Sequence, residues 1–213
     1  ASGYWVDTNR KTTIDGLYAA GDVAGGCPQK YVTGALAEGE IAALDIIKNI
    51  DKLQIGEIDE NDIKEHITEG INFLTNKNAV FSIEQLEEAM QTVMDSYAGG
   101  IKTNYRFNEK QLDIADEKIL KLISLSDKLQ ADDFQELMYI YELKERLVVC
   151  RSVIAHLKAR KETRWHSFAE NIDYPQKDDE NFRKYVNSRF KDGKIEIILR
   201  NLVEGGATYE HSN

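Results

Sequence analysis

Residues 12–26 read Thr12-Thr13-Ile14-Asp15-Gly16-Leu17-Tyr18-Ala19-Ala20-Gly21-Asp22-Val23-Ala24-Gly25-Gly26. The apolar run Leu17–Ala20 predicts a short buried strand, which ends at Gly21 and leaves the carboxylate of Asp22 at its end. A glycine-rich turn follows, and an alanine-rich helix is expected over about 34–50. This order places one carboxylate beside one helix N-terminus, where backbone N–H groups and the helix dipole favour negative charge.

This pair of groups suits a flavin nucleotide, which needs an acceptor for a ribityl hydroxyl and positive dipole near its ring or phosphates. We expect Asp22 to accept from the ribityl chain, although aspartate also commonly caps a turn. The first N–H groups of the helix are expected to face N1 and C2=O of the ring, or else to form an ordinary helix start. Lys30 either contacts the cofactor or is solvated. The expected cofactor-binding residues are Gly21, Asp22, Lys30, Thr33, Gly34, Ala35 and Leu36.

The composition of the chain excludes several classes of function. Its 213 residues carry a formal net charge of −10, which argues against a nucleic-acid partner and against binding to an anionic membrane surface. No apolar run approaches the roughly 20 residues that a membrane helix needs. The two cysteines, Cys27 and Cys150, lie far apart, which indicates a reduced, cytoplasmic setting. The four histidines lack metal-ligand spacing, so we expect no metal site.

The chain lacks the Gly-x-Gly-x-x-Gly motif that normally holds the pyrophosphate of a dinucleotide. Its first residues also read like the interior of a domain. We therefore expect a C-terminal fragment of a longer polypeptide, whose missing N-terminal portion supplies the rest of an FAD-binding domain. Alone, this fragment is expected to bind FAD weakly or not at all and to be inactive, and its sequence identifies no catalytic residue.

Beyond residue 50 the apolar residues recur at helical spacing. Ser82 and Gln85 match a capping box for a helix that ends at Gly99-Gly100. Two longer helices are expected over about 108–129 and 132–161. Because only a short turn joins them, they are expected to form a long antiparallel helical hairpin.

Near the C-terminus the character changes. The dipeptide Asp192-Gly193 separates residues 182–190 from residues 194–200, and the second of these runs is rich in isoleucine. An Asp-Gly pair between two such runs predicts a β-hairpin. The residues after about 200 are expected to be disordered or to form an arm.

The expected fold class is therefore mainly α: a helical bundle with a small α/β remnant and a C-terminal β-hairpin. Three parts are expected: residues 1–50 as the closing segment of an FAD-binding domain, residues 51–180 as a helical domain, and residues 181–213 as the hairpin and tail. In the helix over 34–50, the later apolar side chains are expected to pack inward. These are Leu44, Ile46, Ile47 and Ile50.

The element Gly16–Asp22, followed by a glycine-rich turn and a helix of small residues, resembles the C-terminal part of the FAD domain in the fumarate reductase/succinate dehydrogenase flavoprotein superfamily. Within it, the chain resembles more specifically the alpha (flavoprotein) subunit of adenylylsulfate reductase, over roughly residues 1–190. The segments that carry this resemblance are Gly21–Lys30 with Gly34 and Glu38-Gly39, Asp95–Ile101, Asp133–Met138, Arg160–Trp165 and Asp173–Pro175.

The resemblance implies an FAD-dependent oxidoreductase that interconverts adenylylsulfate with sulfite and AMP, and an iron–sulfur beta subunit as its partner. Fumarate reductases carry a substrate-binding arginine before the final FAD helix. Residues 28–34 contain no arginine, which disfavours fumarate or succinate as substrate. Two alternatives stay open: another FAD-dependent reductase with an unknown acceptor, or a non-catalytic module that binds the iron–sulfur subunit.

A short basic cluster follows the longest expected helix. It consists of Arg160, Lys161, Arg164 and His166. These residues either complement the negative end of the helix dipole or contact the FAD domain or a partner subunit.

Overall fold

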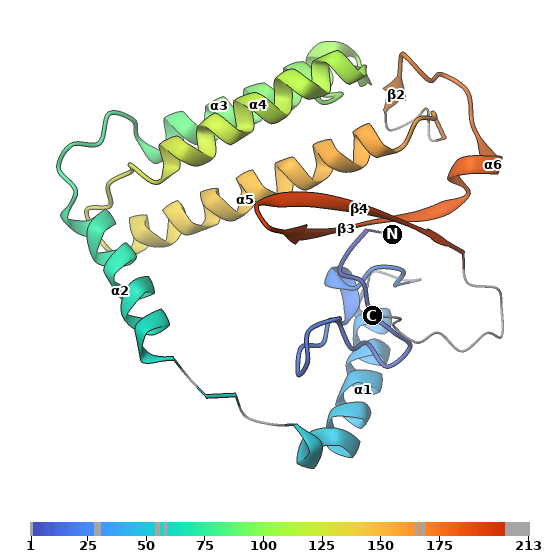
Figure 1. The fold of residues 1–213 in the computed structure, drawn as a ribbon, viewed down its shortest axis with the longest axis horizontal. Helices are drawn as coiled ribbons and strands as arrows, with labels where there is room; N and C mark the ends of the chain where they lie inside the picture. Colours follow the sequence, from blue (N-terminus) through green and yellow to red (C-terminus); the bar gives the residue numbers. More distant parts are fainter. Residues whose placement is uncertain are drawn as a thin grey trace. The chain divides into compact units, whose positions relative to one another are not determined.

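A computed structural model describes residues 2–27, 31–53, 56–57, 59–164, 166 and 169–202. The described chain divides near residue 58 into two compact units, which Figure 1 shows with their helices and strands. The first unit contains the described residues up to 57, and the second spans Asp59–Leu202. The finer division of the chain at residues 50 and 180 stays a prediction.

The first unit is built around helix α1 (Val32–Asn49), which follows the short 3-10 turn η1 (Gly21–Val23) and leads into a second 3-10 turn, η2 (Ile50–Lys52). Among the described residues before α1, strand-like pairing is limited to two isolated bridges, Tyr4 with Ala24 and Lys11 with Tyr18. A small buried cluster of three apolar side chains lies among them: Val6, Ala19 and Ala24.

Two expectations about this unit are wrong for the described structure. Leu17–Ala20 forms one bridge rather than a buried strand, and Leu17 is 48% exposed. The reason is that residues 10–12 are its antiparallel neighbour in a tight turn, through the Thr12 N–H to Leu17 carbonyl bond. The apolar residues late in α1 do not pack inward as a group, because α1 buries only Glu38 and Ala42. Those that are exposed are Leu44, Ile47 and Ile50.

The second unit is mainly helical, as expected. Each of its four long helices begins at a side-chain cap: Asp59, Ser82, Asn108 and Asp133 each accept from a backbone N–H of the first turn. Both hydrogen bonds of the Ser82–Gln85 capping box are present: the N–H of Gln85 donates to Oγ of Ser82, and the N–H of Ser82 donates to Oε1 of Gln85. The helices are α2 (Glu60–Thr75), α3 (Ile83–Tyr97), α4 (Glu109–Ser126) and α5 (Phe134–Ala159).

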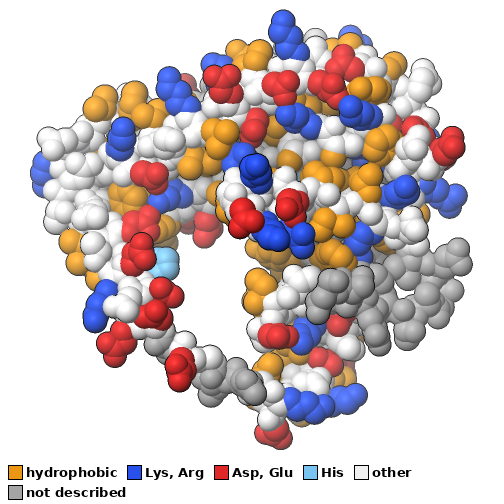
Figure 2. All heavy atoms as spheres, viewed as in Figure 1, with side chains coloured by type: hydrophobic (Ala, Val, Ile, Leu, Met, Phe, Trp, Pro, Cys, Tyr) orange, Lys and Arg blue, Asp and Glu red, His pale blue; other side chains and the backbone are white. Residues whose placement is uncertain are grey.

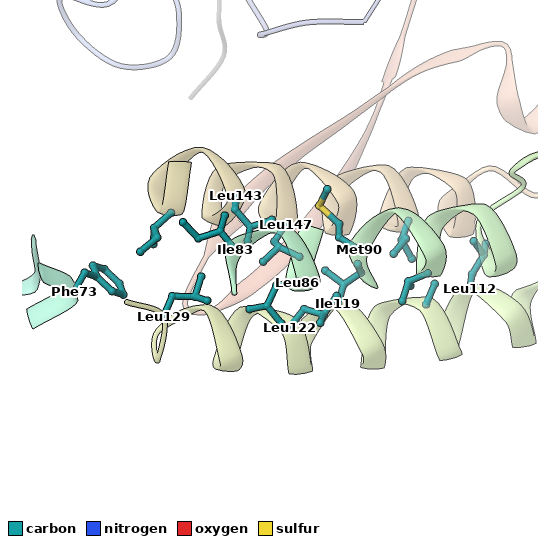
Figure 3. Close-up of a cluster of buried hydrophobic side chains, with 14 of the residues drawn as sticks. Phe73, Ile83, Leu86, Met90, Leu112, Ile119, Leu122, Leu129, Leu143 and Leu147 are labelled. Atoms are coloured by element: carbon teal, nitrogen blue, oxygen red, sulfur yellow. The ribbon is translucent and has the colours of Figure 1, made fainter. Parts of the chain in front are cut away.

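The apolar faces of α3, α4 and α5 pack against one another to form the main core, as Figure 3 shows. Leu112 and Ile119 of α4 and Leu147 of α5 are fully buried. Two ion pairs join α4 and α5 along the seam, the line of contact between these helices: Asp116 with Arg151 at 3.0 Å and Asp113 with Lys158 at 2.6 Å. The partner on α5 comes later in the sequence as the partner on α4 comes earlier. This order confirms the predicted antiparallel hairpin of α4 and α5.

The C-terminal strands β3 (Lys184–Lys191) and β4 (Lys194–Asn201) form the predicted antiparallel hairpin. Asp192 and Gly193 both have positive φ angles, 49° and 75°, as a two-residue turn of this kind requires. The hairpin packs on α5 within the second unit, where Nε2 of His156 lies 2.9 Å from Oγ of Ser188.

One pairing was not predicted from the sequence. Strands β1 (Arg106–Phe107) and β2 (Glu170–Asn171) lie parallel, and their residues are 64 positions apart. Two further short elements complete the unit, the 3-10 turn η3 (Ile101–Thr103) and the helix α6 (Asp179–Phe182).

On the face drawn in Figure 2, acidic and basic side chains are interspersed over the helices of the second unit. Acidic side chains gather along α2, whose first turn carries Glu60 and Asp62. Among the described residues, no helix combines the length and the apolar character needed to cross a bilayer.

We predict that the contact between the hairpin and α5 weakens in acid. Burial lowers the pKa of His156, and the charge of Arg160 lowers it further. The unfolded chain, with a histidine pKa of about 6.5, therefore binds the proton first. The stabilisation is complete above about pH 6.5 and is lost as the pH falls below this value.

The unfolding midpoint, measured between about pH 8 and pH 5, tests this prediction. Part of the midpoint's dependence on pH should disappear in His156→Gln, which cannot titrate. The exposed His66 provides the control, since His66→Gln should keep the full dependence. An unchanged pH profile in His156→Gln would contradict the prediction.

Candidate functional site

The turn at Gly21 lies against the first turns of α1. Its backbone has a φ of +72°, and a Cβ atom there would stand 3.0 Å from the Cβ of Ala35. The N–H of Gly21 donates to Oε2 of Glu38 at 2.9 Å, and its carbonyl accepts from the N–H of Ala24 at 3.0 Å. Both the left-handed backbone and the close approach to the helix require glycine at this position.

Asp22 occupies the middle of this turn. Its side chain is exposed, whereas Gly21 and Ala24 on either side of the turn are buried. The turn therefore presents a carboxylate at the surface of the first unit, where it can accept hydrogen bonds from hydroxyl groups of a ligand.

Helix α1 begins without a side-chain cap from the described part of the chain. Its N-cap, Tyr31, makes no capping hydrogen bond, and the first turn carries no acidic side chain. The N–H of Ala35 donates to the carbonyl of Tyr31 at 2.9 Å, so the N–H groups of residues 32–34 precede the first helical hydrogen bond. Thr33 is exposed and Gly34 is half-buried. Such a helix start favours an electron-rich ligand group.

The structure thus brings the predicted residues of the turn and of the helix start into one small region. Gly21 contacts Ala35. Leu36 is on the same helix, with its side chain 69% exposed. Lys30 lies outside the described residues. An exposed carboxylate, the first N–H groups of a helix and small side chains are the groups that the ribityl chain and ring edge of a flavin need, so these residues fit that part of the cofactor.

A second contact holds α1 beside the segment that leads into the turn. The hydroxyl of the half-buried Tyr18 donates to Oδ2 of Asp45 at 2.7 Å. Burial and the neighbouring Asp45 carboxylate raise the pKa of Tyr18 to about 12. Asp45 follows Glu38 by seven residues, or two helical turns, so both carboxylates lie on the face of α1 that meets residues 18–21.

Sequence reasoning missed the buried ion pair beneath this turn. Glu38 is only 4% exposed, and its Oε1 lies 3.3 Å from Nε of Arg10. These two atoms are within ion-pair distance but are not aligned for a hydrogen bond. The available signal was that Glu38 is the one charged residue in a stretch of small and apolar residues, 34–39.

A second glycine, Gly3, allows the N-terminal segment to cross the same turn. A Cβ atom at Gly3 would lie 2.6 Å from backbone atoms of Val23, Ala24 and Gly25. The backbone of the neighbouring Tyr4 makes two hydrogen bonds to the turn. Its N–H donates to the carbonyl of Val23 at 2.7 Å, and its carbonyl accepts from the N–H of Gly25 at 2.8 Å. The turn is therefore held from both the N-terminal segment and α1.

The arginines of the basic cluster after α5, Arg160 and Arg164, make structural contacts within the second unit. They surround Glu162, whose side chain is fully buried. Nη1 of Arg160 donates to Oε1 of Glu162 at 2.7 Å, and Arg164 donates to both carboxylate oxygens, at 2.8 and 2.9 Å. The N–H of Asp178 donates to Oε2 at 2.8 Å. Glu162 therefore joins the end of α5 to the segment before α6.

This cluster makes further contacts with described residues of the second unit. Arg160 donates to the carbonyls of Phe182 and Lys184, at 2.8 and 3.2 Å, and so fixes the start of β3. Lys161 pairs with Glu109 at 3.0 Å, and His166 pairs with Glu170 at 3.1 Å. Burial alone would raise the pKa of Glu162, but the hydrogen bonds from Arg164, the Asp178 amide and Arg160 hold it below its usual value.

Two hollows lie in the second unit, and neither contains a predicted cofactor-binding residue. One, of about 410 Å³, lies at the end of α2 around Glu69, Phe73 and Asp127. The other, of about 330 Å³, is lined by residues that include Arg106, His166 and Glu170. Across the described ranges, no cluster of three or more histidine, cysteine or acidic residues could hold a metal ion.

Comparison with known proteins gives one matching family. The family model described as the fumarate reductase flavoprotein C-terminal region matches residues 87–205. The alpha subunit of adenylylsulfate reductase from Megalodesulfovibrio gigas is 26% identical over 212 residues, which cover 90% of this chain and 31% of that protein. An uncharacterized FAD-dependent oxidoreductase of Methanocaldococcus jannaschii is 29% identical over 184 residues, 84% of this chain and 32% of that protein.

A solved structure of an adenylylsulfate reductase is also similar to this chain. The adenylylsulfate reductase of Archaeoglobus fulgidus superposes with a TM-score of 0.86 at 31% identity, over 96% of this chain and 34% of that one. The predicted mainly helical fold is therefore confirmed. The chain spans about a third of the length of the relatives that it matches.

We predict that Glu162 contributes strongly to the stability of the second unit. Glu162→Ala leaves two guanidinium groups without their central carboxylate, and breaking a buried pair of this kind costs about 3–5 kcal/mol. The control is Glu142→Ala, which removes an exposed pair with Arg146 at 3.3 Å and should cost less than about 1 kcal/mol. Urea unfolding followed by far-UV circular dichroism measures both losses, and equal losses would contradict the prediction.

Proposed function

The chain belongs to the fumarate reductase flavoprotein C-terminal family, and we propose that it forms the C-terminal third of an FAD-dependent oxidoreductase subunit of the adenylylsulfate reductase type. The observation that carries this proposal is the agreement with adenylylsulfate reductase along nearly the whole chain, at 31% identity and a TM-score of 0.86. The superposition includes 96% of the residues, so it extends over most of both the first and the second unit.

In this proposal the first unit supplies part of the FAD site. Asp22 accepts from a ribityl hydroxyl, and the helix start over Thr33, Gly34, Ala35 and Leu36 faces N1 and C2=O of the ring. The N–H groups of Thr33 and Gly34 are the proposed donors, because the N–H of Ala35 already donates to the carbonyl of Tyr31. Gly21 lets the turn approach the helix closely enough for both contacts, and Lys30 completes the proposed set. FAD, when bound, accepts and gives up two electrons. The residues of this chain bind and orient the ring, and the helix dipole favours the negative charge of its reduced form.

The proposed reaction is the interconversion of adenylylsulfate with sulfite and AMP, in the cytoplasm. The proposed partner is an iron–sulfur beta subunit, and the proposed missing portion is the N-terminal part of the FAD domain. The absence of arginine from residues 28–34 supports this substrate over fumarate or succinate. No catalytic residue is proposed within this chain, and nucleic acid is not a proposed partner.

A second candidate is another FAD-dependent reductase of the same family with a different acceptor. The 29% identity to the uncharacterized FAD-dependent oxidoreductase of M. jannaschii supports it. A third candidate is a helical module without chemistry that binds the iron–sulfur subunit. It is supported by the separate compact unit over Asp59–Leu202.

Purification of the intact subunit separates these candidates. Under the main proposal it contains FAD and, together with its beta subunit, oxidises sulfite with AMP to adenylylsulfate while an artificial acceptor takes the two electrons. Flavin without this reaction favours the second candidate. An intact subunit that purifies without flavin and does not take up added FAD would contradict both enzyme proposals.

Replacement of the turn carboxylate tests the proposed binding contact. Asp22→Ala in the intact subunit should weaken FAD binding about tenfold, which is the usual effect of losing one hydrogen bond to a charged group. Asp15→Ala is the control in the same unit, because the Asp15 side chain is 94% exposed and pairs only with the nearby Lys11 among the contacts described for it. Flavin fluorescence titration measures both affinities. Equal FAD affinities of Asp22→Ala and Asp15→Ala would contradict the proposed contact between Asp22 and the ribityl chain.

A further inference from the structure

The carboxylate of Glu38 lies beneath the proposed flavin turn. Glu38 lies on the same face of α1 as Ala35, three residues earlier, and Ala42, four residues later. Ala35 meets Gly21 in close contact, and Ala42 is 7% exposed. Between these two alanines, the carboxylate of Glu38 reaches the backbone of the turn and accepts from the N–H of Gly21 at 2.9 Å.

Arg10 supplies the opposite charge from another segment. Its Nε lies 3.3 Å from Oε1 of Glu38, and its Nη1 donates to the carbonyl of Asp7 at 3.2 Å. The carbonyl of Arg10 accepts from the N–H of Ala19 at 3.0 Å, in the segment that leads directly into Gly21. Arg10 and Gly21 therefore link Glu38 to the same part of the chain: Gly21 bonds the carboxylate directly, and Arg10 bonds Ala19, two residues before Gly21.

A buried carboxylate is costly unless its charge and its hydrogen bonds are compensated. Here the side chains of Glu38 and Arg10 are 5% and 23% exposed. The compensation comes from the guanidinium of Arg10 and from the backbone N–H of Gly21, the residue directly before Asp22. The arrangement fixes three things relative to each other: helix α1, the loop at Arg10 and the turn at Gly21.

We propose that Glu38, held by Arg10, is a positioning residue that sets the distance between the Asp22 carboxylate and the first N–H groups of α1. This inference rests on the proposed function, since it assigns Glu38 a part in holding FAD without touching it. Asp22 follows Gly21 directly, so a shift of the Gly21 backbone moves the carboxylate that accepts from the ribityl chain. A misplaced carboxylate weakens binding even when its own residue is intact.

The test uses the intact subunit and three variants. Glu38→Ala removes both the hydrogen bond and the charge, whereas Glu38→Gln keeps an oxygen that accepts from Gly21 N–H. Glu40→Ala is the matched control, because Glu40 is exposed on the same helix. Flavin fluorescence titration measures the FAD affinity, and the visible circular dichroism of the bound flavin reports its orientation. The unfolding midpoint of the flavin-free form measures general stability.

We expect Glu38→Ala to bind FAD about tenfold more weakly than the wild type and Glu40→Ala to bind it equally well. Glu38→Gln should recover part of the affinity and show an altered flavin circular dichroism spectrum. If Glu38→Ala does not fold, Glu38→Gln alone decides through its spectrum. A wild-type subunit that binds FAD while Glu38→Gln has the wild-type affinity and spectrum would overturn the inference. A wild-type subunit that cannot bind FAD would overturn the proposed function itself.

Discussion

Burial of the apolar seam between α4 and α5 is the interaction on which the helical unit depends. The seam collects fully buried leucine and isoleucine side chains, among them Leu112, Ile119 and Leu147. Each such side chain contributes roughly 1.5–3 kcal/mol when it leaves water, so several of them together outweigh any surface ion pair. The polar contacts at Arg151 and Lys158 lie along the rim of the seam, where they fix the direction and register of two helices that are already held together by apolar packing.

The first unit is held together in the opposite way. Its buried apolar cluster consists of Val6, Ala19 and Ala24, which together remove little surface from water. Backbone hydrogen bonds and two carboxylates on α1 take the place of a core, at Gly21 through Glu38 and at Tyr18 through Asp45. Glycine is essential to this arrangement, because a side chain at Gly3 would collide with the backbone of the turn.

Local signals in the sequence predicted most of the helical unit. The capping box at Ser82 and the Asp192-Gly193 turn act within a few residues, so their patterns are readable without the fold. Contacts between distant residues were not readable. The β1–β2 pair joins residues 64 positions apart, and Glu162 bonds to Asp178, 16 positions later. In both cases the partners have no distinctive local pattern, and only the path of the chain brings them together.

In the candidate site, too, the local features were predicted from the sequence and the contact between distant residues was not. The predicted residues Gly21, Asp22 and Gly34 follow from a strand-end motif and a helix start, both of which are local. Glu38 was missed because a glutamate in a helix is usually solvated, and its burial depends on Arg10, 28 positions before it. Since the apolar cluster of this unit is small, a carboxylate bonded to the turn can determine its geometry more strictly than packing does. The proposed FAD site needs that kind of fixed geometry, since binding tolerates only small displacements of its donors and acceptors.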